Sequence, residues 1–183
     1  MEELHELKSR MEQERPARWE ELPDLALYMD QIVSYMPRQL IHFDQGETLT
    51  SAMVNNYIKD GLLPRAEGKR YGKTHLAYLT AICALKQVIS VKDAGLLASD
   101  HADGQTGEMY GRFLKQLDLA LKDTAGRLDT DCTEEDLPGL ALSLALQSYA
   151  DRLACQRVID LIRQNQSAAP DKSKKGRKEP KHE

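Results

Sequence analysis

Apolar residues recur at intervals of three and four along most of this 183-residue chain, and glycine or proline repeatedly interrupts the pattern. That interval is the period of an amphipathic α-helix. The sequence therefore predicts a mainly helical, all-α protein. The interruptions divide it into a flexible N-terminal segment (1–16), a first domain (17–98), a C-terminal helical region for packing or dimerisation (105–166) and a disordered basic tail (167–183).

Local signals predict where the helices begin and end. We expect a first helix from Trp19 or Pro23 to Met36, because an apolar stripe runs between them and a proline follows. A second helix is expected between Thr50, a good N-cap, and Gly61, a good C′ residue. The remaining helices are expected from Thr74, after Ser90, over about 108–126, and from a Thr133–Asp136 capping box to about Gln164.

The helix expected at 50–61 has two different faces. Val54 and Ile58 are four residues apart and point inward. The opposite face carries Ala52, Asn55, Asn56 and Lys59. Asparagine is a mediocre helix former, so helix stability does not explain two of them side by side. An asparagine amide can pair with an adenine edge in the major groove, and a lysine can reach a phosphate or a guanine.

The segment after this helix, "RAEGKRYG" (65–72), predicts a short turn or a small β-wing, with glycines as its flexible points. Lys69 and Arg70 flank the turn, and Tyr71 could pack under it or touch a sugar. Between residues 48 and 92 seven basic residues accompany two acidic ones, a net charge of +5 in a chain whose total is −4. Such a basic island indicates a polyanionic partner. The basic tail either adds non-specific attraction to DNA or serves solubility.

The order of these elements resembles the DNA-binding domain of the MerR family. In that family a helix ends in Gly-Leu-Leu/Ile-Pro, and a wing with a basic-aromatic pair, a capped Leu/Ile-rich helix and a short further helix follow. The counterparts here are Gly61–Pro64, Lys69–Tyr71, the segment from Thr74, and Ser90–Asp93. The resemblance implies a MerR-like winged helix-turn-helix with a small β-wing, followed in this chain by a C-terminal helical pair.

Three segments are also similar to the uncharacterised bacterial YkrK-like family: "LYMDQ" (27–31), "MVNNYIKDGLL" (53–63) and "AYL…LKQVIS" (77–90). This resemblance covers roughly 22–97 and implies a MerR-like winged-helix fold with a regulatory role. The chain departs from the MerR pattern at Asn55, near which MerR proteins carry a phosphate-contacting arginine. It also has a longer connector before the second helix, no long antiparallel coiled coil and no metal-binding cysteine loop.

The favoured function is a dimeric, cytoplasmic transcriptional regulator that reads double-stranded DNA. The asparagine face would read bases, the basic residues would bind phosphates, and the tyrosines would support these contacts. A cavity between the C-terminal helices leaves room for an unidentified small-molecule or protein effector. The candidate DNA-binding residues are Thr50, Ser51, Asn55, Asn56, Tyr57, Lys59, Lys69, Arg70, Tyr71 and Lys73.

A protein-interaction module on the same winged-helix core is the alternative, with the apolar helix around 140–162 as its binding surface. An enzyme is disfavoured, because the chain has no phosphate-binding glycine loop and no nucleophile motif, and His75 is expected at the surface. No cofactor, metal site or membrane span is expected. The scattered cysteines predict free thiols in a reducing cytoplasm: Cys83, Cys132 and Cys155.

Overall fold

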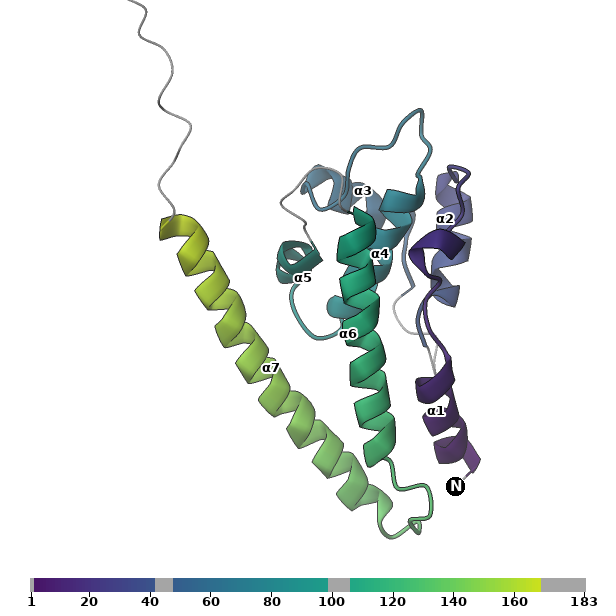
Figure 1. Cartoon of the computed structure of the whole chain (residues 1–183), viewed down its shortest axis with the longest axis vertical. Coiled ribbons are helices and arrows are strands. Elements are labelled where there is room, and N and C mark those ends of the chain that lie inside the picture. Colours follow the sequence, from purple (N-terminus) through teal and green to yellow (C-terminus); the bar gives the residue numbers. More distant parts are fainter. Residues whose placement is uncertain (1, 42–47, 99–105, 169–183) are drawn as a thin grey trace, which may run out of the picture. The chain divides into compact units, whose positions relative to one another are not determined.

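The computed structural model of the protein describes residues 2–41, 48–98 and 106–168 (Figure 1). The prediction of a mainly helical protein is confirmed: the described residues contain no strand, and their antiparallel pairing is confined to two isolated bridges. Most of the basic tail (169–183) and part of the connector (42–47) lie outside the described residues. The elements are α1 (Glu2–Gln13), η1 (Trp19–Glu21, a 3₁₀ helix), α2 (Met29–Tyr35), η2 (Met36–Arg38, also 3₁₀), α3 (Ser51–Lys59), α4 (Lys73–Leu85), α5 (Val91–Ala98), α6 (Thr106–Arg127) and α7 (Leu137–Ala168).

Two compact units make up the chain, Met1–Leu144 and Ala145–Glu183, and the boundary between them falls within α7. Helix α6 belongs to the first unit, where it packs against both α1 and α4. The sequence pattern instead predicted a domain boundary between 98 and 105, with α6 grouped with the last helix. The buried side of α6 explains the difference, because Tyr110 is completely buried and belongs to the same hydrophobic core as α4.

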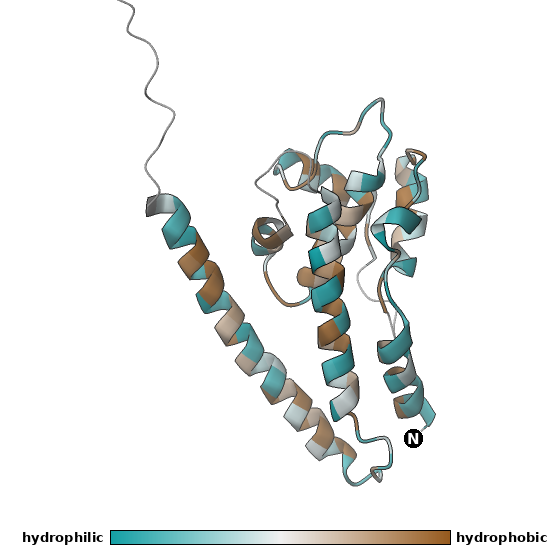
Figure 2. Cartoon of the chain, viewed as in Figure 1, coloured by the Kyte–Doolittle hydropathy of each residue, from teal (hydrophilic) through white to brown (hydrophobic). Residues whose placement is uncertain are grey.

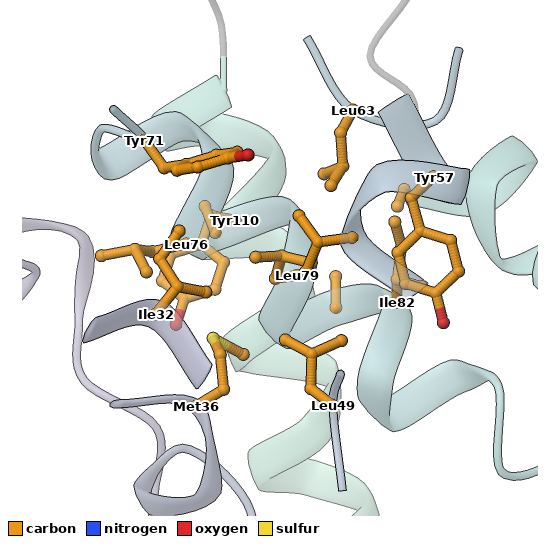
Figure 3. Close-up of a cluster of buried hydrophobic side chains, with 14 of the residues drawn as sticks. Ile32, Met36, Leu49, Tyr57, Leu63, Tyr71, Leu76, Leu79, Ile82 and Tyr110 are labelled. Atoms are coloured by element: carbon orange, nitrogen blue, oxygen red, sulfur yellow. The ribbon is translucent and has the colours of Figure 1, made fainter. Parts of the chain in front are cut away.

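Helix α4 lies at the centre of the hydrophobic core of the first unit (Figure 3). It is apolar around most of its circumference, and Leu76, Leu79 and Ile82 are completely buried. Such a helix must be covered on several sides. Buried side chains from the neighbouring elements cover it: Ile32, Met36, Leu49, Val54, Tyr57, Leu63, Tyr71 and Tyr110.

The N-terminal segment, predicted to be flexible over 1–16, forms helix α1 and packs against α6. Its polar composition suggested a segment without a core contact, but a stripe at helical spacing is half-buried: Leu4, Leu7 and Met11. The Nζ atom of Lys8 donates to the carbonyl oxygen of Leu128 at 3.1 Å, which ties α1 to the residue after α6.

The helix predicted from Trp19 or Pro23 to Met36 is shorter than expected. Only α2 (Met29–Tyr35) is α-helical, between the short 3₁₀ helices η1 and η2. The backbone of Leu27 is extended instead, because it pairs with Tyr71. Leu25, which lies in the apolar stripe that suggested one long helix, is 82% exposed. The helix begins at Met29 because the Gln31 side chain accepts a hydrogen bond from the N–H of Tyr28, at 2.8 Å.

The predicted boundaries of α3 are confirmed, and local hydrogen bonds explain them. The Thr50 hydroxyl accepts a hydrogen bond from the N–H of Met53 at 3.2 Å, as an N-cap residue does. At the other end Gly61 has a φ of 74°, its N–H bonds to the Ile58 carbonyl, and the N–H of Leu62 bonds to the Tyr57 carbonyl. This pair of bonds is a Schellman motif, and it closes α3 firmly.

Capping signals also operate in the later helices. The Ser90 hydroxyl accepts from the N–H of Asp93 at 3.1 Å before α5. The Asp136 carboxylate accepts from both the N–H and the hydroxyl of Thr133, at 2.9 and 2.7 Å, ahead of α7. The residues predicted to form a capping box at Thr133 and Asp136 therefore do bond to each other, although α7 itself starts only at Leu137.

Apolar residues, brown in Figure 2, recur along α7. Several of their large side chains are exposed. Leu146 and Tyr149 are 58% and 61% exposed. An isolated helix gains little stability from such a surface in water. The exposed stripe consists of Leu142, Leu146, Tyr149 and Leu153, and Val158 and Leu161 are exposed further along the helix.

Candidate nucleic-acid interface

The outward face of α3 has the composition expected from the sequence. Asn55, Asn56 and Lys59 are exposed, whereas Val54 and Tyr57 are buried in the core. The two amides and the ammonium group therefore point to solvent from a helix whose other side is held rigidly. A rigid helix with exposed amide and cationic groups has the chemistry needed to contact base edges and phosphates.

The first residues of α3 also lie at the surface. Thr50 and Ser51 are both exposed. The Thr50 hydroxyl oxygen accepts the capping bond of the helix, and its hydrogen remains a donor. The N-terminus of a helix attracts negative charge, so both residues stand where a phosphate would be favoured.

A tight two-residue turn follows α3. The backbones of Glu67 and Arg70 exchange two hydrogen bonds, with N···O distances of 3.1 and 2.9 Å. Gly68 and Lys69, between them, have φ values of 57° and 63°. Two consecutive residues with positive φ define the type I′ geometry typical of tight hairpins. We call residues 67–70 the basic turn.

Lys69 is the only residue other than glycine with a positive φ among those described. This conformation disfavours a side chain with a Cβ atom, and asparagine or glycine is the usual choice at such a position. A lysine at the exposed tip of the turn is therefore not explained by backbone preference. Its charge is the property that distinguishes it from the residues that would fit more easily.

Arg70 is exposed but ordered by an aromatic neighbour. Its Nη2 atom donates to the hydroxyl of Tyr28 at 2.9 Å, and its guanidinium carbon lies 5.1 Å from the centre of the Tyr28 ring. The contact holds the charge at the surface without neutralising it. Sequence reasoning missed Tyr28 as a site residue, because 42 positions separate it from Arg70 and no local signal links the two.

Two predicted site residues cannot touch a ligand at the surface. Tyr57 and Tyr71 are only 6% and 5% exposed. The Tyr71 side chain belongs to the hydrophobic core, and its backbone exchanges two 2.9 Å hydrogen bonds with that of Leu27. Both tyrosines therefore contribute to the core.

Lys73 is half-buried rather than free at the surface. Its Nζ atom lies 2.8 Å from a carboxylate oxygen of Asp24 and 5.5 Å from the centre of the Trp19 ring. It is also the first residue of α4, which follows Gly72 as its N-cap. The prediction that Thr74 caps this helix is therefore wrong by two positions.

His75, expected at the surface, is buried. Its Nδ1 atom accepts a hydrogen bond from the N–H of Gly72 at 3.1 Å, so its side chain caps the start of α4. Its ring lies edge-on to Tyr71, with the ring centres 5.3 Å apart. The Nε2 atom is buried and has no hydrogen-bond partner among the described residues. Burial lowers the pKa of His75 from its ordinary 6.5.

We expect the burial of His75 to make the protein less stable in mild acid. Because the folded-state pKa of His75 lies below 6.5, the unfolded chain binds more protons between those two values, and the free energy of unfolding should fall as pH falls through this window. His75→Gln should remove that pH dependence while keeping an acceptor for the Gly72 N–H. Urea denaturation from about pH 7.5 to about pH 5 measures the difference.

Most cations of the basic island lie around α3 and the basic turn. Lys59, Arg65, Lys69 and Arg70 are all exposed. Arg65 lies between α3 and the turn and joins the candidate surface, although sequence reasoning counted it only toward the total charge. Two acids, Asp60 and Glu67, are interspersed with these four cations and are also exposed. The surface from 59 to 70 therefore carries a net positive charge in a chain that is negative overall.

The described residues offer no metal site and no membrane-spanning helix. No three histidine, cysteine or acidic side chains come together there in a way that could hold a metal ion. No helix in this part of the chain combines the length and apolarity that crossing a bilayer requires. The three cysteines carry free thiols.

Comparison with known proteins gives one family. A family model described as "Domain of unknown function (DUF1836)" matches residues 17–113, more than half of the chain. The match includes η1, α2, α3, the basic turn, α4 and α5, and it ends within α6. No curated protein and no solved structure matches the chain significantly.

Proposed function

The chain belongs to the DUF1836 family of domains of unknown function, and we propose that its first unit binds double-stranded DNA as a transcriptional regulator. Helix α3 would enter the major groove and read bases with Asn55 and Asn56. Lys59, Arg65, Lys69 and Arg70 would bind the phosphates on either side.

The observation that carries this proposal is the pairing of the amide face of α3 with the basic turn. The amide face is exposed while the opposite side of α3 is locked in the core. The basic turn begins eight residues after Lys59, the last residue of that face, and presents two further cations. Groups for base recognition and groups for phosphate binding thus occur on neighbouring segments, as a sequence-specific reader requires.

We further propose a MerR-like winged helix-turn-helix, in line with the resemblance to the MerR and YkrK-like families. Helices α2 and α3 contact each other and would be the two helices of the motif, with α3 as the reading helix. The basic turn would be the tip of the wing, and the pairing between Leu27 and Tyr71 would fix its base. The N-cap and the Schellman motif would fix both ends of α3, and so the positions of the side chains that read the bases.

The partner of helix α7 is proposed to be a second copy of the chain. The exposed stripe from Leu142 to Leu153 follows spacings of four, three and four, which suits the seam of a two-helix pair. A dimer would present two copies of α3 to paired half-sites, the usual arrangement for readers of this kind. The same stripe also favours the alternative function, binding of a different protein without sequence-specific DNA reading.

Sequence preference provides the test of the proposed function. Asn55→Ala/Asn56→Ala should retain general DNA affinity but lose most discrimination between sites, because each bidentate asparagine–adenine pair contributes about 1–3 kcal/mol of discrimination. Recovery and sequencing of genomic fragments bound by wild type and variant measures this. Asn165→Ala, which removes an exposed asparagine on α7, is the matched control and should behave like wild type. The function is rejected if wild-type protein retains no genomic fragments at low salt.

A further inference from the structure

A cavity of about 730 Å³ lies within the first unit, away from α3 and the basic turn. One wall is the segment 13–21, which includes η1, and the other is a face of α6. The volume is in the range of pockets that hold small organic ligands. Nothing in the proposed DNA contacts uses these residues.

Two glycines make room for the cavity. Gly107 and Gly111 lie one turn apart on α6 and both line it. A Cβ atom at Gly107 would approach the Trp19 ring to 3.2 Å, so the indole packs directly on the bare helix backbone. A Cβ atom at Gly111 would meet nothing within 4 Å, so that position opens onto free space. Trp19 and Leu114 supply an apolar surface beside this space.

The opposite wall is held in place before any ligand arrives. The N–H of Ala17 donates to the side chain of Gln39 at 3.1 Å, and its carbonyl accepts from the hydroxyl of Tyr110 at 2.9 Å. Gln39 and Tyr110 are themselves buried. Both polar atoms of one backbone residue are thus anchored to the core, which fixes the extended segment that carries the cavity wall. A preformed wall reduces the ordering cost of binding.

Cations on this surface outnumber the carboxylates available to them. Arg15 Nε and Lys122 Nζ share the single carboxylate of Asp118, at 2.7 and 2.9 Å. These two bonds, the one to Lys122 foremost, lower the pKa of Asp118. Its carboxylate therefore stays ionised and is already paired with Arg15 and Lys122. The Nη2 atom of Arg15 is buried and has no acceptor among the described residues.

Two further cations line the same cavity, Arg18 and Lys115, and both are exposed. The acids nearby are Glu20 and Glu21, and the Glu21 carboxylate is occupied by the N–H of Arg18 at 2.8 Å. Among the described residues, the side chains of Arg18 and Lys115 thus have no ion-pair partner, and they stand beside an apolar surface. That combination binds an anion attached to an apolar body.

We propose that this cavity binds a small organic carboxylate. The apolar body of the ligand lies against Trp19 and Leu114, and its carboxylate is bound by Arg18 and Lys115. A neutral ligand of the same shape would leave these cations without an acceptor and would bind much more weakly.

Trp19 provides a direct readout, because it is the only tryptophan of the chain. The probes are phenylacetate and hexanoate, each compared with its own amide, titrated into the full-length protein while tryptophan emission is followed. Saturable changes are expected with the carboxylates, and at least tenfold weaker binding with the amides. The proposal does not depend on DNA binding, so this experiment leaves the proposed function untouched.

Variants locate the site. Gly111→Phe should abolish binding by filling the free space, whereas Gly111→Ala should retain it. Lys115→Ala should weaken carboxylate binding about tenfold, and it should reduce the difference in affinity between each acid and its amide. Lys92→Ala removes an exposed lysine on α5 and should change neither affinity. Circular dichroism checks that each variant is folded; if Gly111→Phe is not, Lys115→Ala decides the question. No saturable response to either acid, equal binding of acid and amide, or unchanged binding in Lys115→Ala would overturn the proposal.

Discussion

Replacing both Lys69 and Arg70 by alanine is expected to weaken binding of all duplexes about equally, by roughly tenfold or more near physiological salt. Both side chains are exposed on the basic turn, and neither has an acidic partner within the described ion pairs. They are positioned for phosphates, which carry no sequence information. The loss should therefore appear in affinity and leave the order of preferred sites unchanged.

The salt dependence of binding gives a sharper measure of the same variant. Each phosphate contact contributes about −0.9 to the slope of log affinity against log salt, so loss of two contacts should reduce the slope by about two units. Fluorescence anisotropy with one labelled duplex at several salt concentrations gives this value. Lys122→Ala/Arg127→Ala removes the same charge from α6 and should keep the slope. Equal slopes for wild type and Lys69→Ala/Arg70→Ala would show that the basic turn does not contact the DNA phosphates.

The largest effect on stability is expected from Leu79→Ala, at about 2–5 kcal/mol of unfolding free energy. Leu79 is completely buried in the middle of α4, where side chains from several helices surround it. Truncation loses the free energy gained by burying the removed apolar atoms, and it leaves a cavity that the packed neighbours cannot close. Because α4 connects the basic turn to the core, DNA affinity should fall only as far as the folded fraction falls.

Urea denaturation monitored by circular dichroism measures the change. Leu119→Ala is the matched control, because Leu119 is 53% exposed on α6 and its truncation should cost no more than about 0.5 kcal/mol. Similar losses for the two variants would contradict the placement of α4 at the centre of the core.

Signals confined to a few residues predict the local structure well. The N-cap at Thr50 and the glycine at Gly61 are sufficient to place α3, because the groups they satisfy belong to the same helix. The outward position of Asn55 and Asn56 follows from helical periodicity alone. The mainly helical class follows from the same pattern repeated along the chain.

Contacts between distant segments explain what the sequence did not predict. The extended backbone at Leu27 depends on pairing with Tyr71, and the order of Arg70 depends on Tyr28. His75 resembles a surface residue in the first turn of a helix, yet the core closes over it from other segments. No pattern within a short window reports which segment will cover a given side chain.

The packing of α1 along the far half of α6 has a practical consequence for anyone producing a fragment. The family match ends at residue 113, yet Ala125 and Leu128 are buried beyond it, and Lys8 and Arg15 bond to that stretch. Truncation at the limits of the family match would cut α6 at residue 113 and would remove α1, which packs against it. The shortest fragment that keeps these contacts runs from Glu2 to at least Leu128.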